Sequence, residues 1–138
     1  GSAWFYRGPF ASATDKWMRA NHGIMTASDF ARYRIALRDP VATTYRGWQV
    51  YELPPNGQGI AVLQMLNILE GFDLGSLEWG GAEHLHLLIE AKKLAFEDRA
   101  RFYADPAFAA VPVERLIAKD YAAAVTFFVR LLQGSGGL

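Results

Sequence analysis

The spacing of apolar and polar residues predicts helices in the first third of the chain. From Pro9 onward, large apolar side chains recur at helical spacing, and proline is favoured at the first position of a helix. This helix should end at Gly23, where glycine supplies a left-handed cap. A second, short helix should follow Thr26 and run through Tyr33, because Thr26 and Asp29 form a capping-box pattern.

One segment follows the pattern of β-strands instead. Between Val41 and Leu53, β-branched and aromatic residues dominate, and Arg46-Gly47 interrupts them as a turn. We therefore expect an antiparallel hairpin. A two-stranded hairpin is only marginally stable by itself in water, so this one should pack on helices or join a larger sheet.

The rest of the chain is predicted to be helical. Helices are expected at residues 60–70, 82–104 and about 121–132, the last with Asp120 as its N-cap, and a short helix near residues 111–116. The buried face of the long helix should consist of Leu85, Leu88, Ile89, Leu94, Phe96 and Phe102. The last helix carries an apolar stripe of Tyr121, Val125, Phe127, Phe128, Leu131 and Leu132. The elements predict an α+β fold, mainly helical with one β-hairpin, in a single partial domain over residues 1–138.

Composition narrows the class of protein. Hydrophobic residues make up 51% of the chain and charged residues 20%, which excludes a disordered protein. The 14 basic residues balance 14 acidic ones, so no net field attracts phosphates and we expect no nucleic-acid partner. The absence of cysteine excludes a thiol nucleophile and a zinc-thiolate site. No apolar run reaches the roughly 18 residues that a membrane span needs.

Aromatic residues make up 14% of the chain, which is a large share for its length. A short chain buries only a modest fraction of its surface, so its core cannot hide all of these side chains. The excess predicts docking against a missing partner, or self-association.

The histidines do not form a convincing metal site. His84 and His86 lie two residues apart on the long helix and so point in different directions. His86 and Glu90 share a face, but a zinc site needs a third convergent ligand, which we do not find. We interpret these residues as structural, place His22 at a helix end, and expect no metal and no cofactor.

Acidic residues of the long helix offer a second kind of candidate. Glu97 and Arg101 are four residues apart, the spacing of a solvent-exposed ion pair on a helix. We expect Asp98 to lie on the solvent-exposed face of the helix as well. The alternative is that Asp98 forms a buried pair with an arginine from elsewhere in the fold.

The glycine loop before the helix at residues 60–70 supplies the site candidates Asn56, Gly57, Gln58 and Gly59. Free backbone N–H groups at a helix start can hold an anion, but the loop matches neither the P-loop nor the dinucleotide-binding pattern. We therefore interpret it as a structural turn in which Gly57 or Gly59 adopts a positive φ. No serine lies in a Gly-x-Ser-x-Gly motif, so we assign no catalytic residue.

Several stretches, taken in order, match the pattern of a known family. The strongest is Leu53-Pro54-Pro55-Asn56-Gly57-Gln58-Gly59-Ile60, and the others are residues 4–11, 23–33, 45–51, 64–73, 90–99 and 105–108. In order and spacing they resemble the C-terminal part of the large subunit in the gamma-glutamyltransferase (gamma-glutamyltranspeptidase) family. The resemblance covers about residues 4–124, and residues 125–138 form a divergent tail.

The resemblance implies a fold and a chemistry. Proteins of the family are N-terminal nucleophile hydrolases with an αββα sandwich, and their precursor cuts itself into a large and a small subunit. The new terminal Thr of the small subunit attacks the gamma-glutamyl amide of glutathione-like substrates. This chain would then be a fragment of that sandwich with a missing small, catalytic subunit as its partner. The residues themselves indicate no compartment, and the resemblance suggests a bacterial periplasmic or secreted protein.

The catalytic parts of the family do not occur in this sequence. Its Thr-Thr-His cleavage pattern is absent, since Thr44 is followed by Tyr45 and Thr126 by Phe127. The Arg that holds the glutamyl carboxylate lies before the matching stretch. The loop at residues 54–59 also departs from the commoner Pro-Pro-Pro-Ser-Ser-Gly-Gly form, which leaves gamma-glutamyl or acylase-type specificity open. We expect a large-subunit segment that does not catalyse by itself; the alternative is a free-standing helical interaction or scaffold module derived from the family.

Overall fold

The computed structural model describes residues 1–134 in two compact units, one from Gly1 to Leu37 and the other from Arg38 onward. The end of the expected tail, residues 135–138, lies outside the described residues. So do the side chains of Phe128, Leu131 and Leu132, which the sequence placed in an apolar stripe.

The first unit consists of α1 (Ser2–Tyr6), α2 (Pro9–Ala20) and α3 (Ala27–Arg32). Its aromatic rings pack on one another: Phe5 stacks on Phe10 with centroids 4.5 Å apart, and Phe30 meets both rings edge-on. Ala11 is the only buried residue of this unit. The rings therefore hold three short helices together without forming a closed core.

Local signals located α2 and α3 correctly, and the sequence did not predict α1. Thr26 and Asp29 form the expected capping box at the start of α3. The expected left-handed cap of α2 was assigned to the wrong residue, since His22 has φ 58°. Gly23 instead lies close to Met18, whose side chain would have to shift to admit a Cβ atom.

The second unit begins with the predicted hairpin, β1 (Val41–Tyr45) and β2 (Trp48–Glu52). The strands are antiparallel, and Val41 pairs with Glu52. Arg46 and Gly47 both have positive φ, 47° and 86°, as a two-residue type I′ turn requires. The remaining elements are α4 (Gly59–Leu69), the 3₁₀ turn η1 (Leu74–Ser76), α5 (Ala82–Phe102), α6 (Val113–Leu116) and α7 (Lys119–Gly134).

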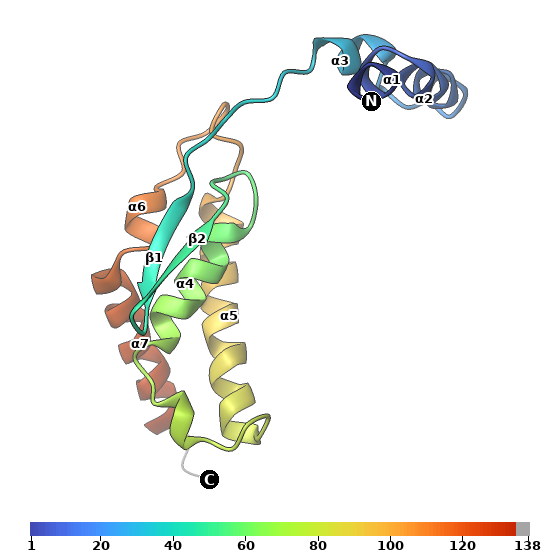
Figure 1. The fold of residues 1–138 in the computed structure, drawn as a ribbon. Coiled ribbons are helices and arrows are strands. Elements are labelled where there is room, and N and C mark those ends of the chain that lie inside the picture. The colour runs from blue at the N-terminus through green and yellow to red at the C-terminus, as the bar shows by residue number, and fades with distance from the viewer. Residues whose placement is uncertain (135–138) are drawn as a thin grey trace. The chain divides into compact units, whose positions relative to one another are not determined.

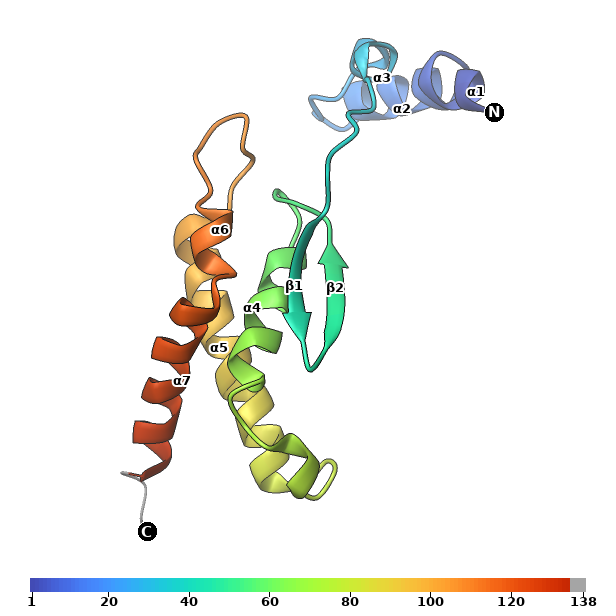
Figure 2. The same ribbon diagram turned by 60° about the vertical axis from the view of Figure 1, so that its left-hand side comes forward.

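Helix α4 is the centre of the second unit. The hairpin lies along one side of it, and α5 and α7 lie on the other side (Figures 1 and 2). Ile60 and Leu63 of α4 are fully buried. Toward its C-terminal end, the core cluster consists of Ile68, Leu69, Leu87, Ala91, Ala122 and Val129.

The buried face of α5 differs from the predicted one. Its buried residues are His84, Leu87, Ala91, Ala95 and Asp98. Of the six side chains expected there, Leu88 and Leu94 are half-buried against the core, whereas Leu85, Ile89, Phe96 and Phe102 are exposed. Ala91 and Ala95 have no exposed surface, and such small side chains allow a neighbouring helix to approach closely. A prediction from hydrophobicity alone therefore chose the wrong face of α5 as the buried one.

Two helix ends also differ from the prediction. Helix α5 ends at Phe102, and α7 begins at Lys119, so Asp120 lies inside the first turn and is not its N-cap. The Asp120 carboxylate accepts a hydrogen bond from the backbone nitrogen of Tyr121. An acidic group in this position also interacts favourably with the positive end of the helix dipole.

Candidate functional site

The glycine loop connects β2 to α4, and Asn56, Gly57 and Gln58 are exposed. Neither Gly57 nor Gly59 has a positive φ, so that part of the prediction is wrong. Gly59 is needed for space instead. A Cβ atom there would lie 2.7 Å from the Glu52 Cβ and 2.8 Å from the Leu53 carbonyl oxygen. At Gly57 the nearest atom to such a Cβ would be 3.9 Å away, which is ordinary contact.

The loop lines an open hollow together with the end of α5. Its lining residues are Asn56, Gln58, Arg99, Tyr103, Ala104 and Asp105. Arg99 and Asp105 carry opposite charges, so the hollow has no excess of positive charge that would attract an anion. This arrangement favours the structural interpretation of the loop.

A buried hydrogen-bond network joins α4, α5 and α7 around Asp98. The Asp98 carboxylate accepts hydrogen bonds from Gln64 Nε2 at 2.7 Å and from the Tyr121 hydroxyl at 2.8 Å. Asp98 is only 9% exposed, so the prediction that it lies on the surface is wrong. The buried alternative named an arginine as partner, whereas the donors here are an amide and a phenol. Glu97, by contrast, forms the expected exposed ion pair with Arg101.

Two tyrosines complete this network. The Tyr103 hydroxyl donates to Gln64 Oε1 at 2.5 Å. Burial, and then the hydrogen bond to the Asp98 carboxylate, raises the pKa of Tyr121 to about 12. Burial, reinforced by the negative charge of Asp98, raises the pKa of Tyr103 as well. Both phenols therefore remain protonated donors over the physiological pH range.

A second network fastens the hairpin to α4 and α7. Asn67 Oδ1 accepts from the Thr43 hydroxyl at 2.8 Å and from Lys119 Nζ at 2.7 Å. Asn67 Nδ2 donates to the carbonyl oxygen of Ile117 at 2.8 Å. Lys119 also donates to the Thr44 carbonyl oxygen and to Glu70 Oε2. All three donor positions of this ammonium group thus have acceptors.

Glu70 follows the last residue of α4, where the helix dipole disfavours a negative charge. Hydrogen bonds from Lys119 and from the Arg46 backbone nitrogen offset this effect and lower the pKa of Glu70. Because Arg46 lies in the hairpin turn, the same carboxylate connects the turn to the start of α7.

The histidines and threonines considered as candidates have structural positions. His84 is buried against the ring of Trp79, His86 is exposed, and His22 follows the end of α2 as expected. The hydroxyl of buried Thr126 donates to backbone carbonyl oxygens. Within residues 1–134, no group of three or more acidic or histidine side chains is placed to hold a metal ion. Among the same residues, no helix is long and apolar enough to cross a membrane.

The polar contacts thus connect structural elements, and similarity to other proteins supplies the functional class. The sequence model of the Gamma-glutamyltranspeptidase family matches residues 1–131. Acylase ACY 1 proenzyme from Pseudomonas sp. strain SE83 is 50% identical over 118 residues, which are 85% of this chain and 21% of that protein. The glutathione hydrolase proenzyme of Escherichia coli K12 is 39% identical over 88% of this chain and 21% of that protein.

Comparison of the fold with solved structures also points to the gamma-glutamyltranspeptidases. The gamma-glutamyltranspeptidase of Helicobacter pylori superimposes with a TM-score of 0.83 at 35% identity, over 94% of this chain and 37% of that one. The chain therefore has the fold of a fragment of an N-terminal nucleophile hydrolase. It belongs to the gamma-glutamyltranspeptidase family and matches only part of the large subunit. It spans about a fifth of the length of the first relatives named above.

We predict that Gly59→Ala lowers the free energy of unfolding by about 1–3 kcal/mol, the usual cost of forcing an extra carbon into a packed site. Gly57→Ala is the matched control and should change stability by no more than about 0.5 kcal/mol, because its Cβ meets no close neighbour. Urea unfolding of the three proteins measures both effects. Equal midpoints for the two variants would contradict the assignment of Gly59 as the confined residue.

Asp98→Asn should lower the free energy of unfolding by about 1–3 kcal/mol, because it replaces the charged acceptor of the Gln64 and Tyr121 hydrogen bonds by a neutral amide, with an NH₂ group in place of one acceptor oxygen. Glu97→Gln is isosteric in the same way and removes only an exposed ion pair, so it should cost about 0–1 kcal/mol. Thermal melts at neutral pH compare the two. If Asp98→Asn is as stable as Glu97→Gln, the buried network does not stabilise the fold.

The raised pKa of Tyr121 predicts a loss of stability at alkaline pH. A tyrosine in the unfolded chain loses its proton near pH 10, whereas Tyr121 in the folded chain keeps it until about pH 12. The folded state binds more protons across this window, so its stability is complete below pH 10 and falls as pH rises toward 12. Tyr121→Phe should reduce this slope in denaturant titrations. Tyr51→Phe, which removes an exposed tyrosine, is the control, and an equal change in both variants would refute the prediction.

Proposed function

We propose that this chain is a large-subunit segment that packs on the catalytic core of a gamma-glutamyltransferase-like enzyme and does not catalyse by itself. The observation that carries the proposal is the exposed apolar surface of the second unit. On α5, Leu85, Ile89 and Phe96 are 46%, 54% and 37% exposed. Large apolar side chains exposed along one face of a helix, here with Lys92 between Ile89 and Phe96, are typical of an interface with another protein part.

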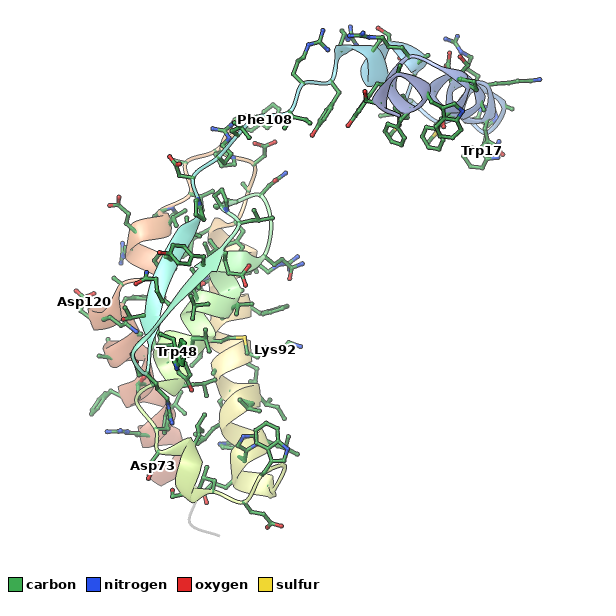
Figure 3. All side chains as sticks on the ribbon, viewed as in Figure 1. Trp17, Trp48, Asp73, Lys92, Phe108 and Asp120 are labelled. Carbon is green, nitrogen blue, oxygen red and sulfur yellow. The ribbon has the colours of Figure 1, made fainter. Side chains whose placement is uncertain are left out.

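The hairpin exposes a second set of apolar side chains, on the other side of α4 (Figure 2). Trp48 and Tyr51 of β2 are 76% and 63% exposed, and the two-stranded sheet has no further strand on either side within residues 1–134. Figure 3 shows the Trp48 side chain near the turn end of the hairpin and Lys92 pointing outward from α5. Because the matched relatives are about five times longer than the aligned stretch, the part of the protein outside this chain is the natural cover for both surfaces.

The proposed reaction of the complete protein is cleavage of an amide by an N-terminal nucleophile, with transfer of the acyl group to water or an amine. Gamma-glutamyl amides are the substrates that the glutathione hydrolase relatives suggest. The higher identity to an acylase, together with the altered loop at residues 54–59, supports an acylase-type acyl donor as the second possibility. We further propose that the missing partner of this chain is the small catalytic subunit, which would carry the nucleophile.

A second candidate function is a free-standing interaction module. One observation favours it, because the residues from Arg38 onward have a buried core of their own around α4. A module of this kind would be a monomer whose apolar residues are covered in solution. The two candidates therefore differ in a measurable property, the exposure of apolar surface by the purified chain.

The purified chain should neither hydrolyse a gamma-glutamyl anilide nor transfer its acyl group to glycylglycine, and it should bind a hydrophobic dye. Ile89→Lys should lower dye binding without lowering the melting temperature, because the side chain lies on the exposed face of α5. Gln49→Lys, on an exposed polar position of β2, is the control for the added charge. Turnover that tracks the purified chain would overturn the proposal, and a dye-free monomer at all dilutions would favour the module.

A further inference from the structure

The three asparagines of the chain lie in very different surroundings. Asn67 is buried in α4 and uses both ends of its amide in hydrogen bonds. Asn21 Nδ2 donates a hydrogen bond to the carbonyl oxygen of Trp17 at the end of α2. Asn56 is exposed in the turn before α4, and it is the only one of the three that glycine follows.

Within the part of the chain that the structure describes, the Asn56 side chain and the backbone nitrogen of Gly57 are not restrained by hydrogen bonds. Among the hydrogen bonds of residues 1–134, none uses the Asn56 side chain or the Gly57 nitrogen. Gly57 is exposed, and a Cβ atom at this position would have its nearest neighbour 3.9 Å away. Glycine has no side chain to hinder approach to its own nitrogen and is the least restricted residue in φ and ψ.

We propose that Asn56 is a site of spontaneous deamidation, a modification independent of the proposed function. The deprotonated backbone nitrogen of Gly57 attacks Cγ of Asn56 and forms a five-membered succinimide ring. The bond from Cγ to Nδ2 breaks, and the nitrogen leaves as ammonia after taking protons from solvent. Water then opens the ring at Cγ to give aspartate, or at the backbone carbonyl to give isoaspartate. The net change is one water consumed and one ammonia released.

The product changes the local charge. A carboxylate at position 56 lies in the same hollow as Arg99 and shortly before the first residue of α4. A negative charge is favourable just before a helix, and in the hollow it would meet Arg99 as well as Asp105, so the aspartate product should leave the fold intact. Isoaspartate instead adds a methylene to the backbone between β2 and Gly59, which is already confined by Glu52 and Leu53. The aspartate and isoaspartate forms should therefore differ in free energy of unfolding, and chromatography should resolve them.

The test is to incubate the folded chain at 37 °C and mildly alkaline pH and to follow each asparagine by peptide mapping with fragmentation. We expect time-dependent conversion at Asn56 to both products, faster at higher pH, with Asn21 and Asn67 remaining as amides. Because the chain has no net charge, the conversion should also produce a new acidic band in isoelectric focusing. If Asn56 persists as long as Asn21 and Asn67, the proposal is wrong.

Gly57→Ala tests the route through the Gly57 nitrogen. The variant should keep the melting temperature of the parent and lose the conversion at Asn56 over the period in which the parent converts. Conversion at the parental rate would overturn the succinimide route. A parallel incubation in denaturant tests the role of the fold, and reaction in denaturant but not in the folded chain would show that the loop is protected, which also overturns the proposal.

Discussion

The second unit depends on two amide side chains buried on one helix. Gln64 and Asn67 are 2% and 5% exposed and lie three residues apart on α4, among residues that are otherwise apolar. Hydrophobic contacts are not directional, so they select one rotation and register of an apolar helix less strictly than hydrogen bonds do. A buried amide without partners costs much more. The partners of Gln64 and Asn67 therefore set the rotation and the register of every element packed on α4.

Each amide orients a different part of the fold. Gln64 binds Asp98 and Tyr103, which fixes α5 and the residues that follow it. Asn67 binds Thr43 and Lys119, which fixes the hairpin and the start of α7. The unit thus buries two polar networks beside its apolar core, whereas several large apolar side chains remain exposed. Exposed apolar side chains of this kind support the proposal that the rest of a larger protein covers them.

The sequence predicted those features whose causes are local. Thr26 with Asp29 identified the start of α3, and Arg46-Gly47 identified the hairpin turn, because caps and turns depend on a few neighbouring residues. It failed at α5 and Asp98, where small alanines and donors from α4 and α7 decide which face is buried. Among the site candidates, the sequence predicted a turn from strand to helix at residues 56–59, and the structure has one. The sequence assigned a positive φ to Gly57 or Gly59, whereas the structure shows that Gly59 is needed for space. The family was recognisable from ordered motifs, since no single residue of the chain carries a catalytic signature.

The geometry of the loop explains how it departs from the commoner Pro-Pro-Pro-Ser-Ser-Gly-Gly form of the family. With Pro54 and Pro55 aligned to the last two prolines of that pattern, its final glycine falls on Gly59, where a side chain would meet Glu52 and Leu53. The departures fall on exposed positions, which are Leu53, Asn56, Gly57 and Gln58. Steric confinement thus explains why Gly59 matches the pattern, while solvent exposure permits the four departing positions to vary. Asn56 and Gly57, on which the proposed deamidation depends, are both among the exposed positions that packing leaves unconstrained.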